Sequence, residues 1–305
     1  MKKIFNSCGI DTIEKEYSKE LDLKQYNSYM SAEYSILSEQ VRHTYKRTTK
    51  IPFKPSHFFN GNRGHYLTNI KESLAAIREL EARLELDCKK NIVRLDIAFD
   101  SFVEFENIRN IMLMLLECLA KELGAKEVLN TRNKKDIKNI KFRTKDIEIT
   151  CYNCRDKNRA ANTRLEIRFL NIKKSKRTDE NIISSKLREI SCLLTKSLKH
   201  FSRVEESYFT YIVNRYREQD FYTFYIENKE LILTSRISQV IFDSLSSNKS
   251  HKSFLRVVRG RTDINFVTKK DLILLVAELK SLINNLLIVD KTSIENESFE
   301  HLMSV

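Results

Sequence analysis

Three short stretches of this sequence alternate apolar and polar residues, at 93–100, 147–152 and 163–169. Because successive side chains of a β-strand point to opposite faces of a sheet, the alternation predicts three strands that each bury one face and expose the other. If the strands share a sheet, their polar residues share one exposed surface. These residues are Arg94, Asp96, Asp100, Glu148, Tyr152, Arg164, Glu166 and Arg168. Such a surface offers carboxylates for a divalent cation, guanidinium groups for a phosphate, and one phenol, which together suit metal-assisted phosphodiester chemistry.

The candidate ligands of a divalent cation are Asp96 and Glu166, on two of the predicted strands. Mg²⁺ and Mn²⁺ take oxygen ligands and usually keep several waters, so a pair of acids on neighbouring strands suits them. Asp100 lies on the same predicted face as Asp96. Four residues of strand separate the two by about 13 Å, which makes Asp100 the weaker candidate.

The same charges allow a second interpretation, a structural network of cross-strand ion pairs. In that network Asp96 would pair with Arg164 or Arg168, and Glu166 with Arg94. Two Arg-x-acid units occur on separate predicted strands, and this repetition favours the metal site over the network.

Tyr152 is the candidate nucleophile, at the end of its predicted strand and just before Asn153-Cys154-Arg155-Asp156-Lys157. A phenol has a pKa near 10 and attacks poorly at neutral pH unless a positive charge or a metal stabilises the phenolate. Attack on a phosphodiester would store the bond energy in a phosphotyrosine link and free a 3′ hydroxyl. An enzyme of this kind can nick a strand and later rejoin it. The alternative for Tyr152 is a packing or rim residue.

The charge of the chain points to a polyanionic partner. The formal net charge is +13 and the pI is about 9.3, and residues 132–177 hold 16 Lys and Arg against 5 Asp and Glu. This concentration around two of the predicted strands favours nucleic acid. Our candidate DNA-binding residues are Arg94, Lys141, Arg143, Arg155, Lys157, Arg164 and Arg168.

Several function classes are excluded or disfavoured by what the sequence lacks. No apolar run is long enough for a signal peptide or a transmembrane helix, and the six cysteines are scattered, so we expect a cytoplasmic protein with reduced thiols and no membrane partner. No Walker-type loop or dinucleotide fingerprint occurs among only five glycines, which argues against nucleotide hydrolysis.

The order of elements predicts an α+β fold, an antiparallel sheet with helices on one face. A helix of about twenty residues from Thr68 and a second from Phe105 to Leu123, ended by Gly124, flank the first strand. Residues 1–66 read as a mixed N-terminal segment that belongs to the core at 67–178. Residues 179–305 read as a mostly helical C-terminal domain for DNA reading or dimerisation, whose last helix begins with a capping box at 268–271.

Three motifs in order resemble the rolling-circle replication initiators of small Gram-positive plasmids, a family related to filamentous-phage initiators. They are Arg94-Leu-Asp-Ile-Ala-Phe-Asp100, Ile147-Glu-Ile-Thr-Cys-Tyr152-Asn153 and Arg164-Leu-Glu166-Ile-Arg168. The resemblance covers about residues 90–170. One position departs from the pattern, because the family usually has Lys two residues after the tyrosine and this chain has Cys154.

The resemblance implies a replication-initiator nuclease type of fold and a DNA nicking and closing activity that needs Mg²⁺ or Mn²⁺. It implies that Tyr152 is the nucleophile and that Asp96 and Glu166 are metal ligands, with Asp100 a weaker candidate ligand. It also implies that Arg94, Arg164 and Arg168 are phosphate or structural partners. It also implies an origin hairpin, single-stranded at the nick, a host helicase as partner, and a homodimer. Two other readings stay open. One is a DNA-binding replication or copy-number factor without catalysis, and the other, less favoured, is an RNA-binding platform.

Overall fold

The computed structural model describes residues 3–17, 42–43, 49–56, 67–83, 85–86, 91–125, 139–154, 161–173, 177–218 and 267–302. In these residues the chain is an α+β fold built on a seven-stranded sheet, in the order β2-β3-β1-β4-β7-β6-β5. Every pair of neighbouring strands is antiparallel. The strands are β1 (Ser7–Tyr17), β2 (Arg42–His43), β3 (Thr49–Phe53), β4 (Ile92–Ser101), β5 (Asn139–Arg143), β6 (Ile147–Asn153) and β7 (Thr163–Phe169). The expectation of an antiparallel sheet with helices is confirmed.

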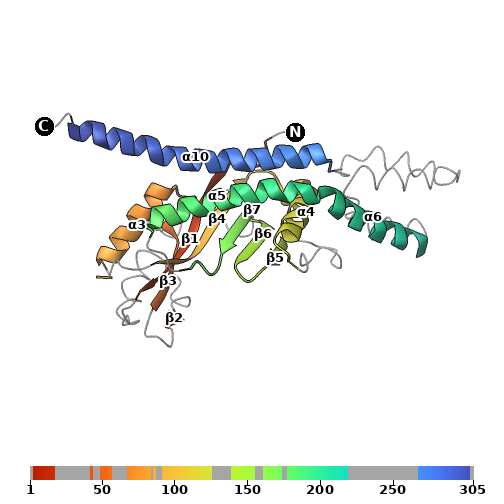
Figure 1. Ribbon diagram of the computed structural model, residues 1–305, viewed down its shortest axis with the longest axis horizontal. Coiled ribbons are helices and arrows are strands. Elements are labelled where there is room, and N and C mark those ends of the chain that lie inside the picture. The colour runs from red at the N-terminus through yellow and green to blue at the C-terminus, as the bar shows by residue number, and fades with distance from the viewer. Residues whose placement is uncertain are drawn as a thin grey trace.

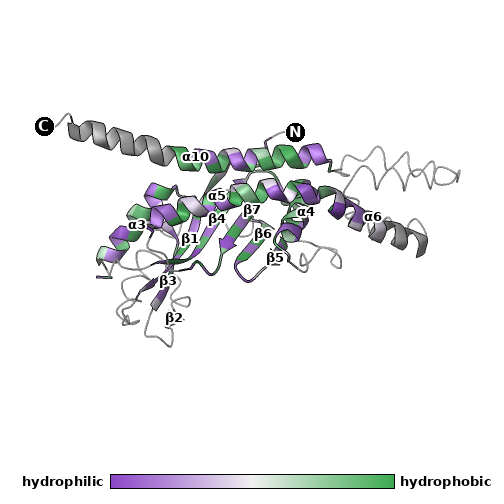
Figure 2. Ribbon diagram, viewed as in Figure 1, coloured by the Kyte–Doolittle hydropathy of each residue, from purple (hydrophilic) through white to green (hydrophobic). Residues whose placement is uncertain are grey.

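The helices pack on one face of this sheet (Figure 1). They are α3 (Ile70–Arg83), α4 (Phe105–Glu122), α5 (Asp179–Ser197), α6 (Phe201–Glu218) and α10 (Lys269–Leu302), with a short 3₁₀ turn η4 (Leu198–His200). Apolar side chains of β4, β6 and β7 alternate inward, and they meet the buried stripes of the helices in one core. Green and purple run side by side along α5 and α10, as expected of amphipathic helices (Figure 2).

The helix ends follow the local sequence. Gly124 ends α4 with a positive φ of 65°, a conformation that glycine adopts without steric cost. At α10 the predicted capping box is present, because Thr268 Oγ1 accepts from the amide of Asp271 while the Asp271 carboxylate accepts from the amide of Thr268. At α3 the box is formed by Asn69 and Glu72, so the helix begins one residue later than Thr68 predicts.

The strand β1 lies inside the sheet, between β3 and β4, within the N-terminal segment that the sequence shows as mixed. A β-bulge at Asp11 interrupts the strand pattern in the sequence, because Ile10 pairs with Ile97 while Thr12 pairs with Asp96. The extra residue breaks the alternation of period 2, so Ile10 and Ile13, three positions apart, are both fully buried.

The last described helix closes the core over the beginning of the chain. Buried side chains of α10 recur at intervals of three and four residues, at Leu272, Leu275, Leu279, Ile283 and Leu286. The carboxylate of Glu278 accepts hydrogen bonds from the backbone amides of Ile4 and Phe5, the first of these at 2.9 Å. Residues of α5 and α10 thus share one core with the sheet, while the separate C-terminal domain expected from residue 179 onward stays a prediction.

Candidate active site on the polar face of the sheet

The pairing of the strands places the predicted polar residues on the face opposite the helices. In the β4-β7-β6 register, Asp96, Arg168 and Glu148 form one cross-strand row. The next rows, two residues further along, are Ala98, Glu166 and Thr150, then Asp100, Arg164 and Tyr152. Three stretches separated by as many as 62 residues of sequence therefore do share one surface.

Three carboxylates converge on this face, from Asp11, Asp96 and Glu166, with one oxygen of each within 4.8 Å of the others. The bulge in β1 is what turns Asp11 toward the two acids of β4 and β7. Opposite ligands of an octahedral Mg²⁺ lie about 4.2 Å apart, so small side-chain adjustments would let these oxygens ligate one ion. An all-oxygen, carboxylate-rich set fits Mg²⁺ or Mn²⁺ rather than a soft metal.

Tyr152 lies directly beside this acidic cluster, defined as Asp11, Asp96 and Glu166. The Tyr152 hydroxyl donates a hydrogen bond to Glu166 Oε2 at 3.1 Å, and the side chain is largely buried. Tyr152 is also the cross-strand neighbour of the cation Arg164. The structure thus brings together the candidate nucleophile and two candidate ligands.

Asp100, the weaker candidate ligand, is engaged elsewhere. Arg164 donates to both of its carboxylate oxygens, at 2.6 Å and 2.7 Å, and a third hydrogen bond joins Arg164 to Asp11 at 2.5 Å. Only 3% of the Arg164 side chain is exposed, so this arginine holds two carboxylates in place and presents little surface to a DNA phosphate. Burial by itself would lower the pKa of Arg164, but the hydrogen bonds to Asp100 and the negative charges of Asp11 and Asp100 raise that pKa above its ordinary value.

The predicted ion-pair network also exists, with the expected pair of Asp96 and Arg168, while Glu166 pairs with Arg168 instead of Arg94. Arg94 binds its own-strand neighbour Asp96 through two hydrogen bonds, one of them 2.8 Å from Nε. Arg168 bridges Glu166 at 2.6 Å and Glu148 at 2.9 Å, and its Nε lies 3.6 Å from Asp96. Metal ligation and ion pairing are therefore two uses of the same carboxylates.

The polar face is less exposed than the alternation predicts. Asp96, Arg164 and Glu166 are at most 2% exposed, and the expectation of an open surface is wrong for them. One physical reason is that the guanidinium groups lie against the carboxylates they bind, so each ion pair covers its own charges. Arg94 and Arg168 keep 23% and 32% of their side chains exposed, and they form the open part of this group.

Of the other candidate DNA-binding residues, two lie at the β5 edge of the same face. Lys141 pairs with Thr150, and Arg143 pairs with Glu148, with 64% of the Arg143 side chain exposed. Cys154, which stands where the family has lysine, is fully buried. Arg155 and Lys157 lie outside the described residues.

Burial has a measurable effect on Asp96. Desolvation, opposed by Arg94 and Arg168 and reinforced by Glu166, raises its pKa from 3.8 to about 7. The folded state then holds a proton that the unfolded state has released above pH 4, so stability falls as the pH rises toward 7. Without divalent metal, we expect the free energy of unfolding to fall by about 2 to 4 kcal/mol from pH 5 to pH 8, measured by urea titration.

Asp96→Asn should flatten this pH profile, because the amide does not titrate. Asp146→Asn, at an exposed aspartate, is the matched control and should leave the profile unchanged. Equal stability of the unsubstituted protein at pH 5 and pH 8 would contradict the assignment.

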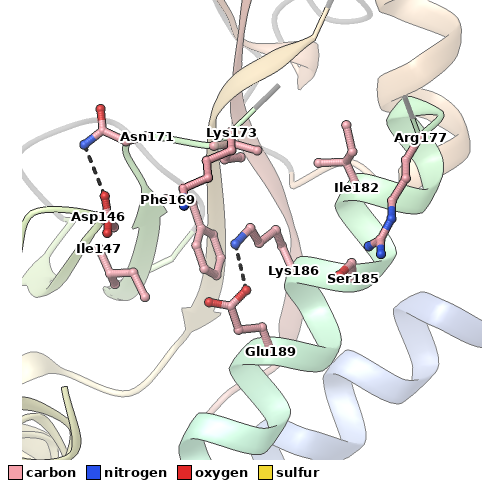
Figure 3. Close-up of a pocket in the computed structure, with 11 residues that line it drawn as sticks. Asp146, Ile147, Phe169, Asn171, Lys173, Arg177, Ile182, Ser185, Lys186 and Glu189 are labelled. Atoms are coloured by element: carbon pink, nitrogen blue, oxygen red, sulfur yellow. Dashed lines mark hydrogen bonds and ion pairs between the residues drawn. The ribbon is translucent and has the colours of Figure 1, made fainter. Parts of the chain in front are cut away.

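A pocket of about 340 Å³ lies away from this site, between α5 and the turn that joins β5 to β6 and the end of β7. In Figure 3 the Lys186 side chain reaches over the Phe169 ring, 4.5 Å from its centroid, and pairs with Glu189. The floor of the pocket is apolar. Its rim carries both signs of charge, with Lys173 and Arg177 on one side and Asp146 on another. The pocket belongs to the helical face and shares no lining residue with the acidic cluster.

Within the described residues, no helix combines the length and the hydropathy needed to cross a bilayer. No known family profile matches the chain, and no curated protein matches it. Among solved structures, it is similar to the regulatory subunit of aspartate kinase from Thermus flavus, with 9% sequence identity and a TM-score of 0.18, over 55% of this chain and 89% of that one. A likeness at this level carries no argument about fold or function.

Proposed function

We propose that this chain is a replication initiator of the rolling-circle type, which binds an origin and nicks and rejoins one DNA strand through Tyr152. The observation that carries the proposal is the hydrogen bond from the Tyr152 hydroxyl to Glu166, because it joins a nucleophile to an acidic cluster suited to Mg²⁺ or Mn²⁺. The net charge of +13 supports DNA as the substrate. An initiator-nuclease fold, a helical C-terminal region for DNA reading or dimerisation, a host helicase partner and a cytoplasmic location are parts of the same proposal.

The proposed reaction is a transesterification at one phosphodiester. The Tyr152 oxygen forms a bond to phosphorus, the bond from phosphorus to the 3′ oxygen breaks, and the phenolic proton passes to the Glu166 carboxylate. The leaving 3′ oxygen takes up a proton to give a 3′ hydroxyl, and the 5′ phosphate stays on the tyrosine. Rejoining reverses these bonds. Asp11, Asp96 and Glu166 would hold the divalent cation, which supplies charge stabilisation to the phosphoryl oxygens when bound.

The experiment is an adduct assay with a 3′-labelled pool of randomised single-stranded oligonucleotides. With Mn²⁺ or Mg²⁺, we expect a labelled protein band that survives denaturation, and with EDTA we expect none. Binding of the pool without any adduct, at every metal concentration, would contradict the enzymatic proposal.

That negative result would favour the second candidate, a DNA-binding replication or copy-number protein without catalysis. A specific observation supports this candidate, since Arg94, Arg168 and Arg164 form ion pairs with the carboxylates Asp96, Glu166 and Asp11. Cys154 in place of a lysine points the same way.

Asp11 gives a separate prediction about the metal. Asp11→Asn should weaken Mn²⁺ binding roughly 10- to 100-fold, as is usual for a change at or next to a metal ligand, measured by calorimetry. Asp100→Asn is the matched control, since Asp100 binds Arg164 and lies outside the acidic cluster, and it should change the affinity less than threefold. Equal losses in the two variants would exclude a specific role for Asp11.

A further inference from the structure

One loop of the fold holds its backbone firmly while exposing an aromatic ring. Phe102 follows the last residue of β4, and at 61% it is the most exposed of the large hydrophobic side chains in the described residues. Single exposed apolar residues are common on protein surfaces. What sets Phe102 apart is the set of hydrogen bonds that fixes the loop on both sides of it.

These hydrogen bonds come from three separate segments. The Phe102 amide donates to Asn6 Oδ1 at 3.1 Å, and its carbonyl accepts from Asn162 Nδ2 at 2.5 Å. The next residue, Val103, is held through its carbonyl by Thr163 Oγ1 at 2.7 Å and through its amide by Ser101 Oγ at 3.0 Å. A loop fixed in this way displays the ring in one place and loses little entropy when a ligand binds.

The position of the loop relates it to the candidate active site. Ser101, Thr163 and Asn153 form the cross-strand row that follows the row of Asp100, Arg164 and Tyr152. Two strand spacings, about 10 Å, separate the β4 end of this row, where Phe102 emerges, from the β6 end beside Tyr152. A strand of DNA that binds with a phosphate at Tyr152 and continues along this end of the sheet would pass the exposed Phe102.

We propose that Phe102 is a stacking site for a nucleobase of single-stranded DNA, next to the nucleotide at Tyr152. The inference rests on the proposed function for its choice of ligand. An aromatic face suits a base from an unpaired strand because every base has a π-face, and the contact tolerates any sequence. A duplex keeps its bases stacked on one another and offers no free face.

The chain contains no tryptophan, so Phe102→Trp introduces a single fluorescent reporter at the site. We expect saturable quenching of this fluorescence when single-stranded oligothymidylate is added in EDTA, and no quenching with a duplex. Phe102→Ala should weaken binding of the same oligonucleotide roughly 5- to 100-fold, measured by anisotropy. Phe102→Leu should also weaken it, because leucine keeps apolar area but loses the ring.

Ile288→Ala is the matched control, at another exposed apolar residue, 55% exposed on α10, and it should change the affinity less than twofold. Unchanged tryptophan emission on binding, or equal affinity in Phe102→Ala, would overturn the proposal. So would emission that changes with protein concentration alone, since this indicates contact with a second copy. These measurements need neither metal nor cleavage, so they succeed or fail independently of the adduct assay.

Discussion

Tyr152→Phe should abolish the covalent adduct completely while leaving DNA binding within about threefold of the unsubstituted protein. Phenylalanine keeps the ring but has no oxygen to attack phosphorus, and it lacks the hydroxyl that donates to Glu166. Loss of one hydrogen bond costs about 1 kcal/mol, so the fold should persist. The measurement is the denaturing gel with the 3′-labelled pool, followed by mass spectrometry of the attached peptide.

Tyr208→Phe serves as the control for this experiment. The Tyr208 hydroxyl also donates to a carboxylate, Glu117 at 3.0 Å, from a buried position on α6. This variant loses the same chemical group in a similar bond and should form the adduct at the normal rate. A Tyr152→Phe protein that still forms the adduct would remove Tyr152 from the mechanism.

Arg164→Met should lower the free energy of unfolding by about 3 to 5 kcal/mol. The substitution leaves Asp100 and Asp11 without the guanidinium that neutralises both, in a place where water has little access. An uncompensated buried charge is among the most destabilising changes a single substitution makes. Since the whole stability of a domain is about 5 to 15 kcal/mol, urea titration should show the effect clearly.

Arg143→Met gives the comparison on the same face of the sheet. This arginine lies 3.8 Å from Glu148 with most of its side chain in solvent, and exposed pairs of this kind contribute less than about 1 kcal/mol. Similar losses for the two variants would mean that burial of the Arg164 network contributes nothing to stability.

The sequence predicts the strands β4, β6 and β7 well because each keeps a strict alternation over its length. The buried residues Leu95, Ile97 and Ile167 and the polar residues between them fall on the predicted faces. Alternation tells which face a side chain occupies, but not what lies on top of it. The burial of Asp96 and Glu166 depends on arginines brought in by pairing, and no local pattern contains that information.

Asp11 escaped prediction for a related reason. The bulge that brings Asp11 to Asp96 and Glu166 also disrupts the alternation around Ile10 and Ile13. For this reason the sequence pattern predicts neither the strand nor the position of the acid. A search for strands that allows one inserted residue would find Ile10-Asp11-Thr12-Ile13, with an acid at the insertion. This is the one sequence signal that could have identified the third carboxylate.

Because Glu278 on α10 binds the amides of Ile4 and Phe5, this part of the fold can form only after α10 has been synthesised. The strand β1 is synthesised before the elements that complete its surroundings, because its neighbour β4 begins at Ile92 and the covering helix α10 begins at Lys269. Contacts between residues so distant in sequence slow folding, and they prolong the time for which aggregation-prone intermediates expose hydrophobic surface. Nascent chains stalled before residue 269 should therefore bind chaperones strongly. Chains long enough to expose α10 outside the ribosome should bind them much less.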